Sequence, residues 1–130
     1  MRPIRTLLPL LFVAFAAAPL DAQAPPGFRD EFLGQFNASM NKFIQLAQAM
    51  PEDRFSWSPG EGVMMVARVY AHVARYNYLY PATSLSVPAP GGEEAEGVEQ
   101  SVAAKAEVVD FLRRSREHVR QAVQGMTDEQ

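Results

Sequence analysis

The sequence contains no cysteine among its 130 residues and only two histidines. The absence of cysteine excludes disulfide frameworks, thiolate zinc sites, iron–sulfur clusters and cysteine nucleophiles together. The formal net charge of −3 also provides no general positive field that would attract phosphate backbones. We therefore expect a protein that does not bind nucleic acid and that has few residues able to support metal or acid–base chemistry.

The rest of the composition is that of a folded protein. Hydrophobic residues make up 48% of the chain and charged residues 21%, which is typical of a globular domain and too apolar for a disordered chain. A length of 130 residues corresponds to about one small domain. We therefore expect one packed domain and exclude a multidomain enzyme.

The N-terminus has the pattern of an export signal. Arg2 and Arg5 give a basic start, an apolar run follows over residues 7–18, and Asp21-Ala22-Gln23-Ala24 supplies small residues at the spacing that a signal peptidase requires. The apolar run is shorter than the ~20 residues that a membrane-spanning helix needs. Cleavage is therefore the better interpretation, and an uncleaved N-terminal anchor is the alternative.

The predicted signal peptide is residues 1–24, and the predicted mature domain is residues 25–130. Cleavage after Ala22 is the alternative to cleavage after Ala24, because Pro25 would disfavour the later position. We expect an exported protein, periplasmic or secreted, that has no membrane attachment after cleavage.

Two helices are predicted in the first part of the mature chain. Apolar residues recur at alternating spacings of three and four from Phe28 to Met50, which is the pattern of one face of an amphipathic helix. Pro51 ends this helix, because proline disfavours the α region for the residue before it. Residues 63–80 are apolar on nearly every face and predict a second helix that is covered on several sides and ends before Pro81.

Residues 81–97 are rich in proline, glycine and glutamate and predict a flexible linker. A third helix is predicted over residues 98–124. Strand alternation of useful length is absent from the sequence, so the expected fold class is all-α with three helices. In the segment between the first two helices, Phe55 and Trp57 are both expected to pack onto the bundle.

The last four residues have the form of a helix start. Thr127-Asp128-Glu129-Gln130 places glutamine three residues after threonine, with acidic residues between them. The all-round apolarity of residues 63–80 also calls for more cover than two neighbouring helices give. We therefore expect a bundle whose fourth helix is missing or truncated. A complete three-helix domain with a polar C-terminus is the alternative.

The two histidines are the residues on which metal or acid–base chemistry would depend. His72 lies in the middle of the second predicted helix among apolar and aromatic neighbours, where an imidazole needs a polar partner or a metal. The positions three and four residues away hold no suitable ligand, so this helix supplies at most one. His72 is therefore either a metal ligand or a buried histidine satisfied by a tyrosine or a backbone group. His118, beside Glu117 and Arg120, is predicted to be solvated.

Three features occur together in residues 28–80: a long Phe-rich first helix, the segment AMPEDRFSWSPGEGV, and a histidine in VYAHVARYNY. In that last segment His72 is followed by Tyr76, Asn77 and Tyr78. In combination these features resemble the DinB/YfiT-like superfamily of four-helix-bundle proteins. The resemblance extends more weakly through KAEVVDFLRRSREHV and so spans most of the mature chain.

The resemblance implies an up-down-down-up bundle in which three histidines bind a divalent metal, commonly zinc or nickel. Some relatives are thiol-dependent transferases or isomerases, and others are described as metal-dependent hydrolases. His72 matches the first of the three histidines, whereas the other two belong to an H-x-x-x-H pair that this sequence does not contain, and His118 does not match that pair. One histidine cannot hold the ion in a three-ligand geometry, so tight metal binding by a monomer is not expected.

Two functions are consistent with these observations. The first is an exported DinB-like metal-dependent enzyme, of hydrolase or thiol-dependent transferase type, that acts on an unknown small molecule and has an incomplete metal site. The alternative is a non-catalytic helical binding module, including a homodimer in which a second copy covers the apolar face of residues 63–80.

Overall fold

The computed structural model of the chain describes residues 27–90 and 92–127. The predicted signal peptide over residues 1–24 and three of the four residues of the predicted C-terminal helix start, 128–130, lie outside the described residues. In the described part of the chain, no helix is long and apolar enough to cross a membrane.

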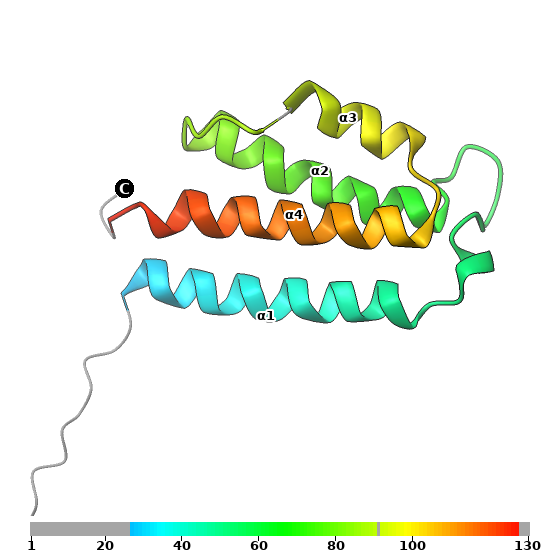
Figure 1. Cartoon of the computed structure of the whole chain (residues 1–130), viewed down its shortest axis with the longest axis horizontal. Coiled ribbons are helices and arrows are strands. Elements are labelled where there is room, and N and C mark those ends of the chain that lie inside the picture. The colour runs from blue at the N-terminus through cyan, green and yellow to red at the C-terminus, as the bar shows by residue number, and fades with distance from the viewer. Residues whose placement is uncertain (1–26, 91, 128–130) are drawn as a thin grey trace, which may run out of the picture.

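The described residues form four α-helices and no strand, which confirms the all-α class. The helices are α1 (Phe28–Ala49), α2 (Val66–Ser84), α3 (Gly92–Ser101) and α4 (Lys105–Gln124), and a single 3₁₀ turn, η1 (Glu52–Arg54), follows α1. The three long helices α1, α2 and α4 run up, down and down, and the short α3 runs back along α2 (Figure 1).

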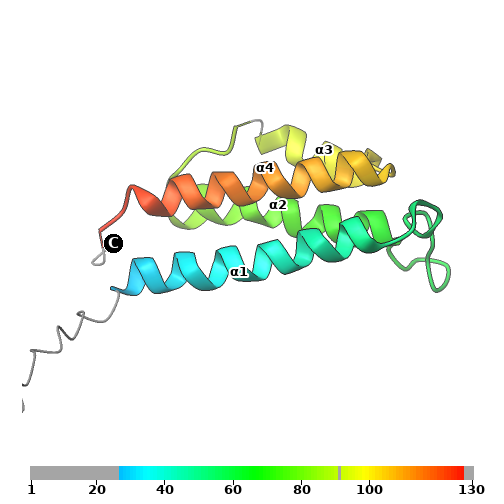
Figure 2. The same ribbon diagram turned by 60° about the horizontal axis from the view of Figure 1, so that its bottom comes forward.

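Helix α4 packs against both other long helices, whereas α3 packs on α2. In both ribbon views α3 lies on the side of α2 that is away from α1 (Figures 1 and 2). The space beside α4 and between α1 and α2 is therefore not covered by α3. The residues of α2 described below lie between this space and α3.

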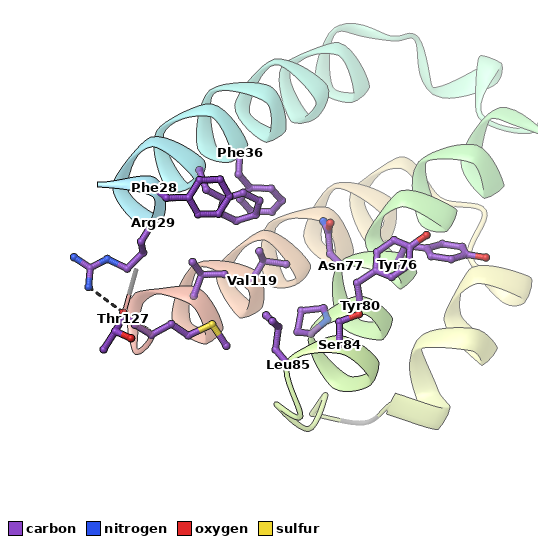
Figure 3. A pocket seen from close by; sticks show the side chains of 14 residues that line it. Phe28, Arg29, Phe36, Tyr76, Asn77, Tyr80, Ser84, Leu85, Val119 and Thr127 are labelled. Carbon is purple, nitrogen blue, oxygen red and sulfur yellow. Dashed lines mark hydrogen bonds between the residues drawn. The ribbon is translucent and has the colours of Figure 1, made fainter. Parts of the chain in front are cut away.

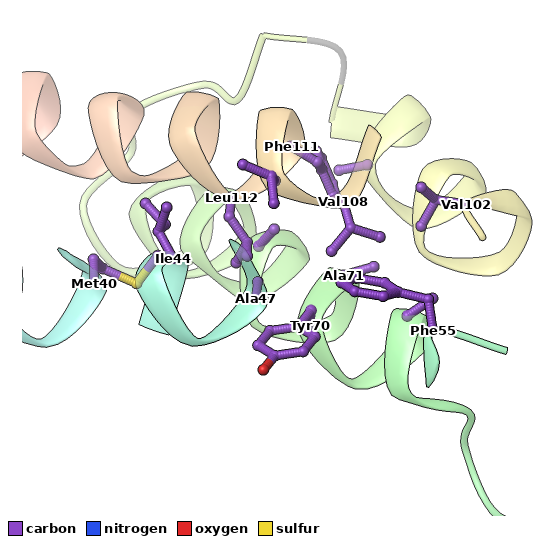
Figure 4. Close-up of a cluster of buried hydrophobic side chains, with 14 of the residues drawn as sticks. Met40, Ile44, Ala47, Phe55, Tyr70, Ala71, Val102, Val108, Phe111 and Leu112 are labelled. Carbon is purple, nitrogen blue, oxygen red and sulfur yellow. The ribbon is translucent and has the colours of Figure 1, made fainter. Parts of the chain in front are cut away.

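The core lies at one end of the bundle, where side chains from the three long helices meet (Figure 4). Its largest fully buried side chains are Phe55, Phe111, Leu112 and Val108. Phe55 comes from the loop after η1 and stacks on Tyr70 of α2, with 6.0 Å between the ring centroids. Burial of one such apolar side chain stabilises the fold by about 1.5–3 kcal/mol.

The prediction for the two loop aromatics was half right. Phe55 is 1% exposed, but Trp57 is 52% exposed. The backbone carbonyls of both residues accept hydrogen bonds at the start of α2: that of Phe55 from the N–H of Ala67, and that of Trp57 from the N–H of Val66. The loop is thus attached to the helix end through its backbone, and only the Phe55 ring is drawn into the core.

Helix α2 does not end at Pro81 as expected. It continues to Ser84, with Pro81 buried in its last turn. Proline lacks the backbone N–H of the helix ladder, but its carbonyl still accepts hydrogen bonds from Leu85 and Val87. The proline therefore costs one helical hydrogen bond near the helix end and does not stop the helix.

The linker prediction for residues 81–97 is corrected by α3. Composition indicated that this segment cannot bury enough surface to become ordered, yet α3 begins at Gly92 and Ala95 is buried in the structure. The predicted single helix over residues 98–124 is interrupted at residues 102–104, so the count is four helices instead of three. No glycine or proline marks this interruption, and tertiary contacts on both sides of it are the reason.

Those contacts are polar on one side of the break. Lys105, the first residue of α4, donates from Nζ to the carbonyl of Met50 at 2.7 Å, and its backbone N–H donates to Glu52 Oε1 at 3.2 Å. The carboxylate of Glu52 therefore caps α4 from the turn that follows α1. Val102, in the break itself, is buried.

Candidate functional site

A row of side chains on one face of α2 contains the sequence-predicted residue His72. Arg68, His72, Tyr76 and Tyr80 are spaced by four residues, so they lie one above the other along the helix. The face on which they lie is the one that α1 and α4 leave partly open. We call these four residues the α2 row.

His72 forms its main contact with a residue that the sequence did not identify. Its ring nitrogen Nδ1 lies 2.8 Å from Oε1 of Glu99 on α3. The Glu99 side chain is 3% exposed, whereas the His72 side chain is 38% exposed. In the neutral ring, Nδ1–H donates to the carboxylate, and Nε2, which forms no hydrogen bond with the described residues, carries the free lone pair.

Glu99 is held ionised by the cations around it. Its second oxygen, Oε2, accepts a hydrogen bond from Nη1 of Arg75 at 3.0 Å. Burial by itself would raise the pKa of Glu99, but the hydrogen bonds from His72 and Arg75, together with the charge of Arg75, outweigh it and hold the pKa below its ordinary value. A buried carboxylate therefore fixes the orientation of the His72 ring and at the same time attaches α3 to α2.

Arg68 is the member of this cluster with the fewest polar contacts. Its Nε lies 3.8 Å from Oε1 of Glu99, which is an ion-pair distance and too long for a hydrogen bond. That nitrogen is buried and has no hydrogen-bond partner within the described residues. The side chain as a whole is 43% exposed, so the rest of the guanidinium faces solvent.

Aromatic rings continue the α2 row beyond His72. The ring of Tyr76 meets the His72 ring edge-on, with 4.7 Å between centroids, and contacts Tyr80 at 5.1 Å. The guanidinium of Arg75 also lies over Tyr76, 5.7 Å from its centroid. The rings of Tyr76 and Tyr80 lead from the histidine to a cavity.

The cavity lies over α4, between the start of α1 and the end of α2 (Figure 3). It has a volume of about 370 Å³. Its walls are mostly aromatic and aliphatic: Phe28, Phe32, Phe36, Tyr76, Tyr80, Val119 and Val123. At one end, Nη1 of Arg29 donates to the carbonyl of Met126 at 3.0 Å and so joins the start of α1 to the end of α4. This volume is within the range of small-molecule sites, about 300–1,000 Å³.

Asn77, which belongs to the segment that carried the family resemblance, also lines the cavity. Its side-chain nitrogen donates to Ser115 Oγ at 3.0 Å and contacts Met40 Sδ at 3.6 Å. The Ser115 hydroxyl itself donates to the carbonyl of Leu112, so its oxygen acts as acceptor for Asn77. Asn77 thus links α1, α2 and α4 beneath the cavity.

His118 is not solvated, contrary to expectation. It is buried on α4, its ring packs against Tyr78 at 5.0 Å, and its Nε2 has no hydrogen-bond partner among the described residues. Burial lowers its pKa, so the ring is neutral at pH 7. The neighbouring Glu117 and Arg120 pair with each other on the surface and do not draw the imidazole outward.

A three-ligand metal centre is not formed by the described residues, which contain no group of three or more His, Asp, Glu or Cys able to hold an ion. The His72–Glu99 pair nevertheless has the form seen in metalloproteins, where a ligating histidine donates its other N–H to a carboxylate. One ligand with its supporting partner therefore fits a metal, whereas the full ligand set does not.

Sequence reasoning missed Glu99 because this residue lies at the start of the predicted third helix, and nothing in the sequence indicates which segment that helix end contacts. The spacing of Arg68 and Arg75, four residues before and three residues after His72, was visible and indicates a shared helix face. That spacing predicts a need for an acidic partner, but it does not say which of the many glutamates supplies it.

Comparison with known protein families matches residues 35–130 to the DinB superfamily. Searches of curated proteins and of solved structures each gave no significant match.

Proposed function

We propose that this chain, which belongs to the DinB superfamily, is an exported divalent-metal-dependent enzyme of the hydrolase or thiol-dependent transferase type, with His72 as a metal ligand. One observation carries the proposal. The buried carboxylate of Glu99 contacts Nδ1 of His72 and leaves Nε2 of this partly exposed side chain without a hydrogen-bond partner among the described residues.

The physical reason is the tautomer of the imidazole. A metal binds the lone pair of a neutral imidazole nitrogen, so the proton must lie on the other nitrogen. Glu99 favours the proton on Nδ1, because its ionised carboxylate accepts a hydrogen bond from Nδ1–H. Its contact with Arg75 restrains the carboxylate from the second side.

A zinc-type ion bound at such a site would polarise a coordinated water molecule, with a pKa near ~7 when three protein ligands hold the metal. The described residues supply one of these ligands, so the proposal requires further donors from outside them or from a second copy of the chain. His118 does not serve, because it is buried against Tyr78.

Nitrogen-detected NMR of the two imidazoles, recorded while Zn²⁺ or Ni²⁺ is added, tests the proposal. We expect Nε2 of His72 to shift or broaden at metal concentrations that leave His118 unchanged. The effect should be lost in His72→Ala and require about 10–100-fold more metal in Glu99→Gln. A metal response that is the same in wild type and His72→Ala would refute the assignment.

Export is proposed from the pattern over residues 1–24. Expression of the whole chain in a bacterium, followed by fractionation and N-terminal sequencing, tests it. We expect a periplasmic or secreted product that begins at Gln23 or Pro25. A cytoplasmic product that keeps Met1 would contradict export.

A non-catalytic helical binding module is the second candidate, and exposed aromatic side chains favour it. Phe28 and Tyr80 lie on opposite sides of the cavity and are both more than half exposed. In this role a second copy covers that face. Sedimentation analysis distinguishes the candidates: a stable dimer that does not respond to metal supports the module, and a monomer whose His72 responds to metal supports the enzyme.

A further inference from the structure

The geometry points to an organic anion with an apolar tail as the substrate class of this site. The acidic group binds Arg68, the apolar part enters the cavity between α1 and α2, and the portion between them passes His72. This inference rests on the proposed function only for what happens at His72; the binding of such a ligand stands on separate observations.

The charge of Arg68 is the first observation. The two oxygens of Glu99 accept hydrogen bonds from His72 and Arg75, and Arg75 also pairs with Glu96 at 3.4 Å. Arg68 has only the 3.8 Å contact to Glu99, and its terminal nitrogens form no hydrogen bond within the part of the chain that the structure describes. A guanidinium with free planar donors is suited to a carboxylate or a phosphate.

The position of Arg68 in the α2 row is the second observation. A step of four residues along an α-helix advances by about 6 Å, so Arg68 lies one turn from His72 and two turns from Tyr76. Tyr76 forms part of the cavity wall. A ligand that lies along this face therefore meets a positive charge, an imidazole and an apolar cavity in that order.

The cavity is the third observation, because it accepts an apolar group and little else. Phe28 and Phe36 of α1 face Tyr80 of α2 and Leu85, the residue after α2, across it, and Val119 of α4 forms its floor (Figure 3). Apart from Arg29, which is already bonded to Asp30 and to a backbone carbonyl, no charged side chain among the described residues lines it. The cavity thus suits an alkyl or aryl tail, and Arg68 suits an anionic group. The two lie at opposite ends of the α2 row.

Calorimetric titration in chelator-treated buffer tests the inference, with decanoate as the probe. Decanol keeps the tail without the charge, and acetate keeps the charge without the tail. We expect decanoate to bind, decanol to bind about tenfold more weakly and acetate not to bind measurably. Arg68→Gln should lower decanoate affinity about tenfold and leave decanol unchanged. The matched control Arg114→Gln, at an exposed arginine paired with Asp110, should change neither.

A second variant tests the tail. Ser84 is exposed and lies on the cavity rim, so Ser84→Trp fills the entrance without disturbing the core, and Leu46→Trp adds the same group at an exposed position outside it. Ser84→Trp should reduce binding of both decanoate and decanol, and Leu46→Trp should reduce neither. Equal affinity for decanoate and decanol, or unchanged binding in Arg68→Gln, would overturn the inference.

The outcomes separate this inference from the proposed function. Decanoate binding that depends on Arg68, together with a His72 that ignores metal, would refute the metal role alone. A metal-responsive His72 in a chain that does not bind decanoate would refute the substrate class alone. A dimer whose interface excludes decanoate, detected by sedimentation in the same samples, would also overturn the inference and identify a second copy as the occupant.

Discussion

The imidazole of His72 and the carboxylate of Glu99 meet across 27 residues of sequence, with 2.8 Å between Nδ1 and Oε1. This contact has two consequences. It orients the only exposed imidazole in the described part of the chain, and it holds α3 against α2. The proposed metal site and the attachment of α3 to α2 therefore both involve the carboxylate of Glu99.

Glu99→Gln is expected to destabilise the fold at pH 7 by about 1–3 kcal/mol. Its partners lose a buried negative charge, but their partial exposure to solvent limits the cost. Because the pKa of Glu99 is depressed in the folded state, its contribution is fully present above its usual value near 4.5 and is lost as the pH falls through the folded value. Urea unfolding of wild type and variant should show a gap at pH 7 that narrows in acid.

The matched control for that experiment is Glu117→Gln. The pKa of Glu117 is lowered to about 2 by hydrogen bonds from Arg120 and Gln121, but these groups lie on the surface of one helix. The substitution should change the urea midpoint little. A larger effect at Glu117 than at Glu99 would contradict the central role assigned to the buried carboxylate.

His118 is expected to make the fold sensitive to mild acid. Burial lowers its folded pKa below the usual value near 6.5, so the unfolded chain binds the proton more readily. Stability should therefore fall as the pH drops below ~6.5, by up to about 1.4 kcal/mol per pH unit. His118→Phe keeps a ring against Tyr78 and should reduce this loss, as measured by urea midpoints at pH 7.5 and 5. Parallel pH profiles in the two proteins would show that another group is responsible.

Phe55→Ala is expected to cost about 3–5 kcal/mol, because it empties a fully buried position beside Tyr70. Trp57→Ala, two residues further on, removes a side chain that is half exposed and should cost far less. Thermal unfolding of both variants checks the pair. Similar losses from the two substitutions would mean that Trp57 is packed in solution, as its sequence context predicted.

Helix α3 should open without unfolding the bundle when its packing is removed. Ala95 is buried where α3 meets α2, so Ala95→Asp should accelerate amide exchange in residues 95–101 while α1 and α4 keep their protection. Gly97 has open space around its Cα, so Gly97→Ala should keep or raise protection of α3, since alanine favours the helix by about 1 kcal/mol. Loss of protection throughout the chain in Ala95→Asp would show that α3 is part of the cooperative core.

The helical class, the limits of α1 to within one residue and the single histidine of α2 could all be derived from the sequence. They depend on spacing along one helix, and apolar periodicity and proline positions report that spacing directly. The family was also recognised from the amino-acid sequence around His72. The ion pair between Asp110 and Arg114, four residues apart on α4, also forms at 2.8 Å, as that spacing on a helix favours.

The continuation of α2 through Pro81, the formation of α3 and the break before Lys105 were decided by tertiary structure. So were the burial of His118 and the pairing of His72 with Glu99. In each case a contact between segments outweighed a local preference: Ala95 and Glu99 gained packing and charge partners that composition could not show, and Glu52 capped a helix more than fifty residues away. The preference of a segment for a helix can be read from its own residues, whereas the partner of a buried charge is determined only when the helices have packed. For this protein the sequence identified the histidine that we propose as a metal ligand, and the packed structure determined which carboxylate contacts it and which cavity lies near it.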